Sequence, residues 1–337
     1  MANYTAIENI ALWTSIVLFY VIAVIFIVRY ARLKSSVRHQ APKLEDSGSQ
    51  DTVSTSVKTD YTVTGTGNNA TGQEPSTPRS VPINLTSPDW ARKKVSSKEG
   101  GNTVVFDDVT KHFRLDERTT ITPVRKVNLE IGRGEFVVIL GRSGTGKTTL
   151  LNLAAGLVCP SSGTVYLDGE DLSAMTQEQL SEMRSRKLGF IFQFPSLIPA
   201  LTIKDNISLP AMFGDQDSEQ ASERALDLLK MLGLSEKADV FPRQLSAGET
   251  KRIVVARSLI NQPQLILADE PTSDLDAKTE QEVLHLLREI NETGVTFLIV
   301  THSMQLVPFA TRAFEMDHGE LTEINTRKFS GVPAELA

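Results

Sequence analysis

The chain has 337 residues, of which 40% are hydrophobic and 23% are charged, and this is the composition of an ordinary globular protein. It excludes wholesale disorder, a collagen-like repeat and a polytopic membrane protein. The formal net charge of -6 argues against nucleic acid as a partner, and the single cysteine, Cys159, excludes an intramolecular disulfide. The mean hydropathy of -0.12 hides an uneven distribution of apolar residues.

The most apolar segment is Ile10–Val28, which contains no charged side chain. As a helix it would be about 28 Å long, close to the thickness of the hydrocarbon core of a bilayer. A core helix would be shorter and would have a polar face, and a signal peptide would begin with basic residues. Residues 1–9 carry Glu8 as their single charged side chain. We therefore predict an extracytoplasmic tail over 1–9 and a single transmembrane helix, in contact with membrane lipid, over 10–28.

A basic and then polar segment follows this predicted helix. Its first part contains Arg29, Arg32, Lys34, Arg38 and Lys43. Because basic residues stay on the cytoplasmic side, we expect a single-pass protein of the cell membrane with the rest of the chain in the cytoplasm. From about residue 44 the chain is rich in Ser, Thr, Gly, Asn and Pro and cannot bury enough apolar surface to fold. We predict a basic juxtamembrane segment and a disordered, flexible linker over 29–102.

The pattern changes at Thr103, where strand-like apolar runs begin. These runs are Thr103–Phe106, Phe136–Leu140, Leu188–Phe192, Leu265–Ala268 and Thr296–Val300. Helical patterns lie between them, at Glu178–Arg186, Ser222–Leu232 and Lys278–Glu292. Strands that alternate with helices predict an α/β domain with a largely parallel sheet. We place this domain at 103–325 and a C-terminal tail at 326–337.

A glycine-rich loop, G-R-S-G-T-G-K-T at Gly141–Thr148, lies between an apolar strand and an apolar helix. It matches the Gly-x4-Gly-Lys-Ser/Thr pattern, in which glycines let backbone N–H groups surround phosphates. Lys147 would approach the β- and γ-phosphates and Thr148 would bind Mg²⁺. The predicted nucleotide contacts are Gly141, Arg142, Ser143, Gly144, Thr145, Gly146, Lys147, Thr148 and Thr149. The loop predicts a nucleoside triphosphate, but it does not say what the energy drives.

Two adjacent acids, Asp269 and Glu270, end the apolar run L-I-L-A-D-E. Carboxylates at the end of a buried strand need compensation, which a metal ion with its water supplies. We expect Asp269 to hold Mg²⁺ and Glu270 to polarise the water that attacks the γ-phosphate.

A third motif, L-S-A-G-E at Leu245–Glu249, precedes the helical run K-R-I-V-V-A-R-S-L-I. Ser246 and the small residues after it lie where a helix is expected to begin, with N–H groups and the helix dipole facing outward. That geometry suits a γ-phosphate, but by itself the motif indicates a helix N-cap and nothing more.

Six motifs in order resemble those of an ATP-binding cassette (ABC) ATPase. They are the phosphate loop, F-Q-F at Phe192–Phe194, L-S-A-G-E, L-I-L-A-D-E, S-D-L-D at Ser273–Asp276 and T-H at Thr301–His302. The resemblance covers about residues 103–325. It implies a P-loop NTPase with a RecA-like α/β core, an antiparallel β subdomain and a helical subdomain. It also implies ATP and Mg²⁺ as cofactors, ATP hydrolysis, and a homodimer or heterodimer of cassettes, because two cassettes of this family enclose two nucleotides.

The resemblance assigns roles to individual residues. Phe113 matches the aromatic residue that stacks on adenine, although a core Phe at a strand end is the alternative. Gln193 matches the glutamine that reaches Mg²⁺ and the attacking water, and His302 matches the histidine that contacts the γ-phosphate. Asp276 belongs to the loop that contacts the second cassette. The residues expected to contact ATP on the partner cassette are Leu245, Ser246, Ala247, Gly248 and Glu249.

Two motifs depart from the family pattern. The usual signature is L-S-G-G-Q, whereas this chain has Ala247 and Glu249. Ala247 keeps the backbone N–H but adds a methyl group beside the phosphate, so we expect activity at a lower rate. Asp274 stands where a small residue is more usual, and nothing in the sequence explains that change.

The sequence around two of the motifs is similar to that of the lipoprotein-release and macrolide-export branch, which contains the LolD-like, MacB-like and FtsE-like ATPases. The matching stretches are K-L-G-F-I-F-Q-F-P-S-L-I-P-A-L-T-I-K-D-N-I and L-A-D-E-P-T-S-D-L-D. This resemblance implies a separate integral membrane permease, expected to dock near Phe194–Leu201. Burial of that apolar segment within the cassette is the alternative. ATPases of this branch usually lack an N-terminal anchor.

Three functions compete at this point. The leading prediction is an ATPase subunit whose permease exports or extracts a lipid, lipoprotein, peptide or drug-like substrate. The alternative is an FtsE-like ATPase that drives transmembrane signalling to cell-wall remodelling without transport. The cassette sequence does not distinguish these two functions. A soluble cassette of translation or DNA repair is disfavoured, because the chain has one phosphate loop, no long coiled coil between its motifs and a predicted anchor.

Overall fold

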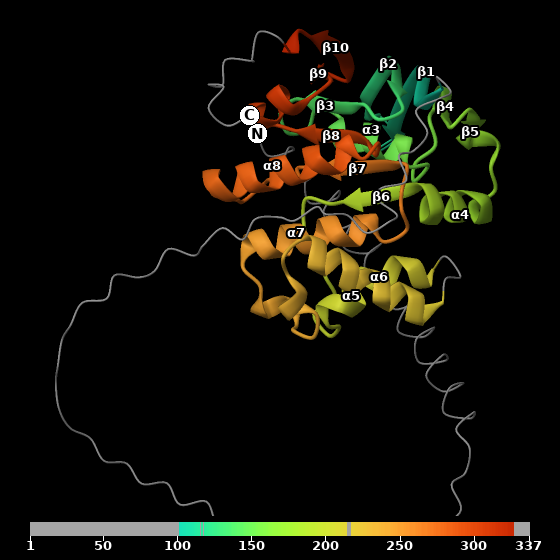
Figure 1. The fold of residues 1–337 in the computed structure, drawn as a ribbon. Helices are drawn as coiled ribbons and strands as arrows, with labels where there is room; N and C mark the ends of the chain where they lie inside the picture. The colour runs from blue at the N-terminus through green and yellow to red at the C-terminus, as the bar shows by residue number, and fades with distance from the viewer. Residues whose placement is uncertain (1–100, 115, 117, 214–216, 327–337) are drawn as a thin grey trace, which may run out of the picture. The chain divides into compact units, whose positions relative to one another are not determined.

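The central feature of the fold is a sheet of six strands in the order β10-β9-β3-β8-β7-β6 (Figure 1). The computed structural model describes residues 101–114, 116, 118–213 and 217–326. The strands of this sheet are β3 (Phe136–Leu140), β6 (Leu188–Ile191), β7 (Leu265–Asp269), β8 (Thr296–Thr301), β9 (Arg312–Asp317) and β10 (Glu320–Ile324). All neighbouring pairs are parallel except β9 and β10. The predicted largely parallel sheet is therefore confirmed.

Alternate residues of the central strands pack into two different hydrophobic cores. In β3, Phe136, Val138 and Leu140 belong to one core, whereas Val137 and Ile139 belong to the other. Helices and strands therefore cover both faces of the sheet, which explains why its strands are continuous apolar runs and not alternating ones.

One core lies between the sheet and a group of helices. These are α5 (Ile203–Met212), α6 (Ser218–Met231), α7 (Ala247–Leu259) and α8 (Ala277–Glu292), with the short 3-10 turns η2 (Ser235–Lys237), η3 (Pro242–Gln244) and η4 (Met304–Phe309). In Figure 1, α8 lies along the sheet, and α5, α6 and α7 form a separate layer below it. The sequence predicted α6 to begin at Ser222, but it begins at Ser218 because the Asp217 side chain caps it there.

The second core lies between the other face of the sheet and an antiparallel sheet in the order β2-β1-β4-β5. The strands of this antiparallel sheet are β1 (Asn102–Arg114), β2 (Thr120–Gly132), β4 (Ser162–Leu167) and β5 (Glu170–Asp171). The helices on this side are α3 (Lys147–Ala154), η1 (Leu172–Ala174) and α4 (Gln177–Lys187). The apolar run at Thr103–Phe106 marked only the start of β1. The described residues thus contain an α/β core, an antiparallel β part and a helical part, as the resemblance implied.

Within the described residues, no helix is long and apolar enough to cross a membrane. The predicted tail 1–9 and transmembrane helix 10–28 lie outside the described residues. The same is true of the linker 29–102 up to residue 100 and of the C-terminal tail after Thr326.

Asn206 of α5 fixes the backbone that leads into this helix. Its side chain is fully buried, and its Oδ1 accepts a hydrogen bond of 2.7 Å from the Ile198 N–H. Its Nδ2 donates to the carbonyl oxygens of Ile198, Leu201 and Thr202 at 3.1, 3.2 and 2.9 Å. One side chain therefore satisfies the backbone polar groups of a whole turn.

We expect Asn206→Ala to lower the free energy of unfolding by about 2 to 3 kcal/mol, because the Ile198 N–H and the Leu201 carbonyl oxygen lose the hydrogen-bond partner that Asn206 supplies. Urea denaturation followed by circular dichroism would measure this loss. Lys204→Ala is the matched control on the same helix, because it removes only a partly exposed ion pair with Asp239 that is worth about 1 kcal/mol or less. Equal losses for the two variants would contradict the assignment to Asn206.

Candidate active site

The phosphate loop turns sharply between β3 and α3, and glycine is required at its end. Gly144 has a φ of 81° and Gly146, which precedes α3, has a φ of 108°. A side chain at Gly146 would collide with the carbonyl oxygen of Pro123. The close approach of β2 therefore keeps the loop tight, and its backbone N–H groups can converge on one point.

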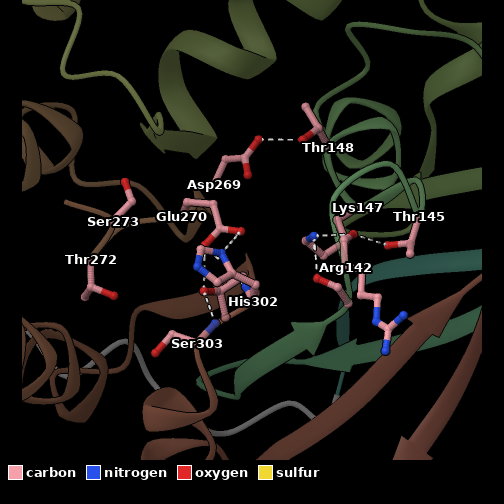
Figure 2. A network of polar contacts seen from close by, with 12 residues as sticks. Arg142, Thr145, Lys147, Thr148, Asp269, Glu270, Thr272, Ser273, His302 and Ser303 are labelled. Atoms are coloured by element: carbon pink, nitrogen blue, oxygen red, sulfur yellow. Dashed lines mark hydrogen bonds and ion pairs between the residues drawn. The ribbon is translucent and has the colours of Figure 1, made fainter. Parts of the chain in front are cut away.

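Lys147 begins α3, and its side chain curls back into the loop (Figure 2). Its Nζ donates to the carbonyl oxygens of Gly141 and Arg142 at 2.7 and 3.0 Å. Burial lowers the pKa of Lys147, whereas the carboxylates of Glu270 and Asp269 raise it again. The ammonium group thus lies within the electrostatic reach of both acids.

Asp269 is the last residue of β7 and lies opposite the start of α3. Its Oδ2 accepts a hydrogen bond of 2.7 Å from the Thr148 hydroxyl. Burial raises the pKa of Asp269, and the Thr148 hydrogen bond lowers it in part. Positive charge beside this carboxylate would favour its ionised form.

Glu270 is buried, with 8% of its surface exposed, and it is held by the end of β8 (Figure 2). Its Oε2 accepts hydrogen bonds from the Thr301 hydroxyl at 2.8 Å and from the His302 N–H at 3.3 Å. Its Oε1 lies 2.9 Å from Nδ1 of His302. The φ of Glu270 is 47°, a conformation that costs energy for a residue other than glycine.

The signature motif forms the start of α7 and is a helix cap, as its sequence indicated. The Ser246 hydroxyl accepts from the Glu249 N–H at 3.2 Å, and Glu249 Oε2 accepts from the Ser246 N–H at 2.8 Å. Lys237 Nζ lies 3.0 Å from Glu249 Oε1. Burial opposes ionisation of Glu249, but the contacts with Ser246 and Lys237 hold its pKa below the usual value.

The next predicted residue, Asp276, is the N-cap of α8. Its carboxylate accepts from the N–H groups of Lys278 and Thr279, both at 3.1 Å, and from the Thr279 hydroxyl at 2.6 Å. A side chain at Gly248 would lie 2.6 Å from Cγ2 of Thr279. The first turns of α7 and α8 are therefore in close contact, and Gly248 permits it.

Gln193 follows β6, the strand next to β7, and its side chain is exposed. Its backbone oxygen accepts a bond of 3.3 Å from Lys251 of α7. Farther along the same segment, the guanidinium of Arg257 donates to the carbonyl oxygens of Pro195 and Ser196, both at 2.8 Å. Burial lowers the pKa of Arg257 to about 10. Two cations of α7 therefore hold the backbone of this segment.

The apolar segment Phe194–Leu201 is divided between surface and core. Phe194 is 61% exposed, whereas Leu197 packs against the core. Nearby, Phe192 is 43% exposed, and its ring stacks on Phe190 at 5.5 Å between centroids. Burial within the cassette therefore accounts for only part of the segment, and the ring of Phe194 is in contact with solvent beside that of Phe192.

The predicted site residues do not all lie together. Lys147, Thr148, Asp269, Glu270 and His302 meet at the C-terminal edge of β3, β7 and β8 (Figure 2). Among the described residues, neither Phe113 nor the signature makes a hydrogen bond to this cluster. Phe113 is half-buried in β1, where Lys111 Nζ lies 5.0 Å from its ring centroid.

Sequence reasoning missed the role of Lys251. Lys251 begins the run K-R-I-V-V-A-R-S-L-I, whose middle, I-V-V-A, is apolar. Because lysines are mostly exposed, the sequence alone did not indicate that this one is buried or which groups it contacts.

Comparisons with known proteins agree with this geometry. The chain matches the ABC transporter family over residues 124–273. It is 39% identical over 220 residues to an ABC transporter ATP-binding protein of Thermotoga maritima, which covers 65% of this chain and 94% of that protein. It is 41% identical over 217 residues to the ABC transporter ATP-binding protein MJ1508 of Methanocaldococcus jannaschii, with coverages of 64% and 96%.

A longer relative and a solved structure match the same region. The macrolide export ATP-binding/permease protein MacB of Vibrio parahaemolyticus is 42% identical over 215 residues, which are 64% of this chain and 33% of that protein. The ATP-binding cassette MJ0796, solved as a dimer in a post-hydrolysis state with ADP and Pi, is similar with a TM-score of 0.62. It is 39% identical and covers 66% of this chain and 99% of that one. The chain therefore belongs to the family of ABC transporter ATP-binding proteins, and its described residues form the ATPase cassette of that family.

Proposed function

We propose that this cassette binds ATP with Mg²⁺ between its own phosphate loop and the signature of a second cassette, and that hydrolysis drives a separate membrane permease. The observation that carries the proposal is the cluster of Lys147, Thr148, Asp269, Glu270 and His302 at one edge of the sheet. Parallel α/β sheets bind their ligands at this edge.

The phosphate loop would hold the triphosphate. The Lys147 ammonium is bonded to two carbonyl groups of the loop and would move to oxygens of the β- and γ-phosphates. Backbone N–H groups of Gly141–Thr149 would surround the β-phosphate, helped by the dipole of α3. Phe113 would stack on adenine, since its ring is half-buried and already has a cation beside one face.

The residues at the edge of β7 fit a magnesium ion. Thr148 and Asp269 supply a hydroxyl and a carboxylate 2.7 Å apart, and Gln193 carries an amide oxygen after the neighbouring strand. Oxygen ligands of this kind are those that Mg²⁺ prefers. Burial raises the pKa of Asp269, and a divalent cation beside it would lower that pKa again. Bound there, the ion would neutralise charge on the phosphates.

Glu270 would act as the general base. Thr301 and the His302 N–H would keep Oε2 fixed, while Oε1 accepts a proton from the water that attacks the γ-phosphorus. The bond between the γ-phosphorus and the bridging oxygen would break as the new one forms, giving ADP and phosphate. The His302 side chain is 68% exposed, so its imidazole can leave Oε1 and contact the γ-phosphate.

A second cassette, identical or different, would complete each site. The signature Leu245–Glu249 begins α7, and Ser246 and Ala247 are exposed there. The Ser246 hydroxyl accepts one bond within the cap and keeps its own hydrogen to donate to a γ-phosphate. Asp276 and the loop before it would contact the partner. Similarity to the dimeric cassette MJ0796 supports this assembly.

The permease would dock near Phe194–Leu201, where Phe192 and Phe194 are exposed and Arg257 fixes the backbone between them and the core. We place the protein in the lipoprotein-release and macrolide-export branch. Similarity to MacB supports export, and FtsE-like signalling stays the alternative. The segment 10–28 would anchor the cassette to the cytoplasmic side of the cell membrane through residues 29–102.

We expect Glu270→Gln to reduce steady-state ATP hydrolysis by about 10²-fold or more, the usual contribution of a general base, and to accumulate an ATP-bound dimer. Phosphate release and size-exclusion chromatography with Mg-ATP would measure both effects. Glu292→Gln, the same chemical change at an exposed position of α8, is the control. Hydrolysis at the wild-type rate in the Glu270 variant would refute its role as base.

We expect Lys147→Ala to weaken ATP binding by at least about tenfold, because it removes a charge-assisted contact with the phosphates. Isothermal titration with ATP would measure the affinity, and Lys230→Ala, at an exposed lysine of α6, should leave it unchanged. Normal nucleotide affinity in the Lys147 variant would contradict the assignment of the phosphate loop.

Deletion of residues 1–30 should release the protein from membranes when its permease is absent, because the apolar run supplies the anchoring energy. Sedimentation of membranes, followed by immunodetection in pellet and supernatant, would measure the distribution. A truncated protein that still sediments with membranes under these conditions would show that the anchor is wrongly assigned.

A further inference from the structure

The buried lysine of α7, Lys251, has no part in the chemistry proposed above. It is 6% exposed, and the residues that follow it, Ile253, Val254 and Val255, belong to the core. An ammonium group in such surroundings is costly unless hydrogen bonds and opposite charge compensate for lost water. The position therefore needs an explanation in terms of what the ammonium contacts.

The contacts of Lys251 join three separate segments of the chain. Its Nζ donates to the backbone oxygen of Gln193 at 3.3 Å and to the Ser273 hydroxyl at 3.3 Å. Gln193 follows β6, and Ser273 follows Glu270 at the end of β7; the Ser273 N–H in turn donates to the Glu270 carbonyl oxygen at 3.2 Å. One ammonium thus connects α7 to the loops after two neighbouring strands.

The charges near Lys251 include Asp274, the acid that stands where the family more usually has a small residue. Burial lowers the pKa of Lys251, and the negative charges of Asp274 and Glu270 raise it. Asp274 is exposed and has a φ of 64°, a conformation that Asp adopts more readily than most residues. Asp274 directly follows Ser273, the residue of this loop that Lys251 contacts.

We propose that Lys251 is a positioning residue for ATP hydrolysis, which holds the Gln193 segment and the Ser273–Asp276 loop in fixed relation to α7. This inference rests on the proposed function and adds to it. Gln193 would reach the attacking water, and the Ser273–Asp276 loop would reach the second cassette. The lysine would keep both loops aligned with the signature at the start of the same helix.

The first test is substitution of the lysine itself. Lys251→Met should lower kcat for ATP about tenfold, as expected for loss of a charged hydrogen-bond donor, and should leave KM for ATP within about twofold, because no phosphate contact is removed. Lys251→Gln keeps a donor without the charge and should fall between Met and the wild type. A kcat for Lys251→Met equal to that of the wild type would overturn the proposal.

The second test is a double-mutant cycle with Ser273, whose hydroxyl accepts from Lys251 Nζ at 3.3 Å. Ser273→Ala should lower kcat by a smaller factor than Lys251→Met, because it removes one of the two contacts of the ammonium. The double variant should be no slower than Lys251→Met alone, since Ser273 acts through Lys251. If the two effects multiply, Ser273 acts independently and the link through Lys251 is refuted. Lys251→Gln takes the place of Lys251→Met in the cycle should the Met variant fail to fold.

Two controls separate this inference from the proposed function. Lys230→Met removes an exposed lysine of α6 and should change neither kcat nor the thermal midpoint. Glu270→Gln in the wild-type background establishes that the measured hydrolysis belongs to this site. If Glu270→Gln has no effect, the proposed function itself fails. If it abolishes hydrolysis and Lys251→Met does not slow it, only the positioning role fails.

Discussion

The whole site depends on charged side chains at the edge of a sheet that is apolar on both faces. Lys147, Asp269 and Glu270 are each partly or fully withdrawn from water where β3, β7 and β8 end. None of these charges is cheap to bury, and each depends on the others or on hydroxyl groups of the same edge. A triphosphate with its cation would complete the balance. The affinity of this surface for ATP and the cost of folding it therefore have the same origin.

Several residues of this edge have a backbone conformation that is unusual for their type or that requires glycine. Glu270 and Asp274 have positive φ values of 47° and 64°, as do Gly144 and Gly146 in the phosphate loop. The glycines adopt this conformation without strain, whereas the backbone of Glu270 is held by hydrogen bonds from its N–H to the Val300 carbonyl oxygen at 2.9 Å and from the Ser273 N–H to its own carbonyl oxygen at 3.2 Å. The positive φ of Glu270 destabilises the fold where the orientation of a carboxylate matters, and the packing of the two hydrophobic cores offsets this cost.

Prediction from the sequence succeeded where one physical rule dominated. The run at Phe136–Leu140 was continuous and apolar, because β3 is buried on both faces, and the predicted bounds agree with the structure. The cap at Ser246 and the cluster around Asp269 followed from residue type and position. The antiparallel strands β2 and β4 were missed, because their patterns are half-buried and irregular. The contact between Glu270 and His302, and the partners of Lys251, depend on which strands are neighbours. That order is a property of the folded sheet and not of any local pattern.

The hydrogen bonds from Arg257 to the backbone of Pro195 and Ser196 have a mechanical consequence. α7 has 13 residues and is therefore about 20 Å long. Ser246 caps the N-terminal end of α7. Arg257, in the last turn, is hydrogen-bonded to the carbonyl oxygens of Pro195 and Ser196, next to the exposed Phe194. A hydrogen-bonded helix of this length is a stiff spacer, so a displacement at Ser246 reaches Pro195 with little loss. If the permease docks on Phe194 as proposed, its displacement would be set by the rotation of α7 as one rigid helix, and not by the flexibility of the loops at its ends.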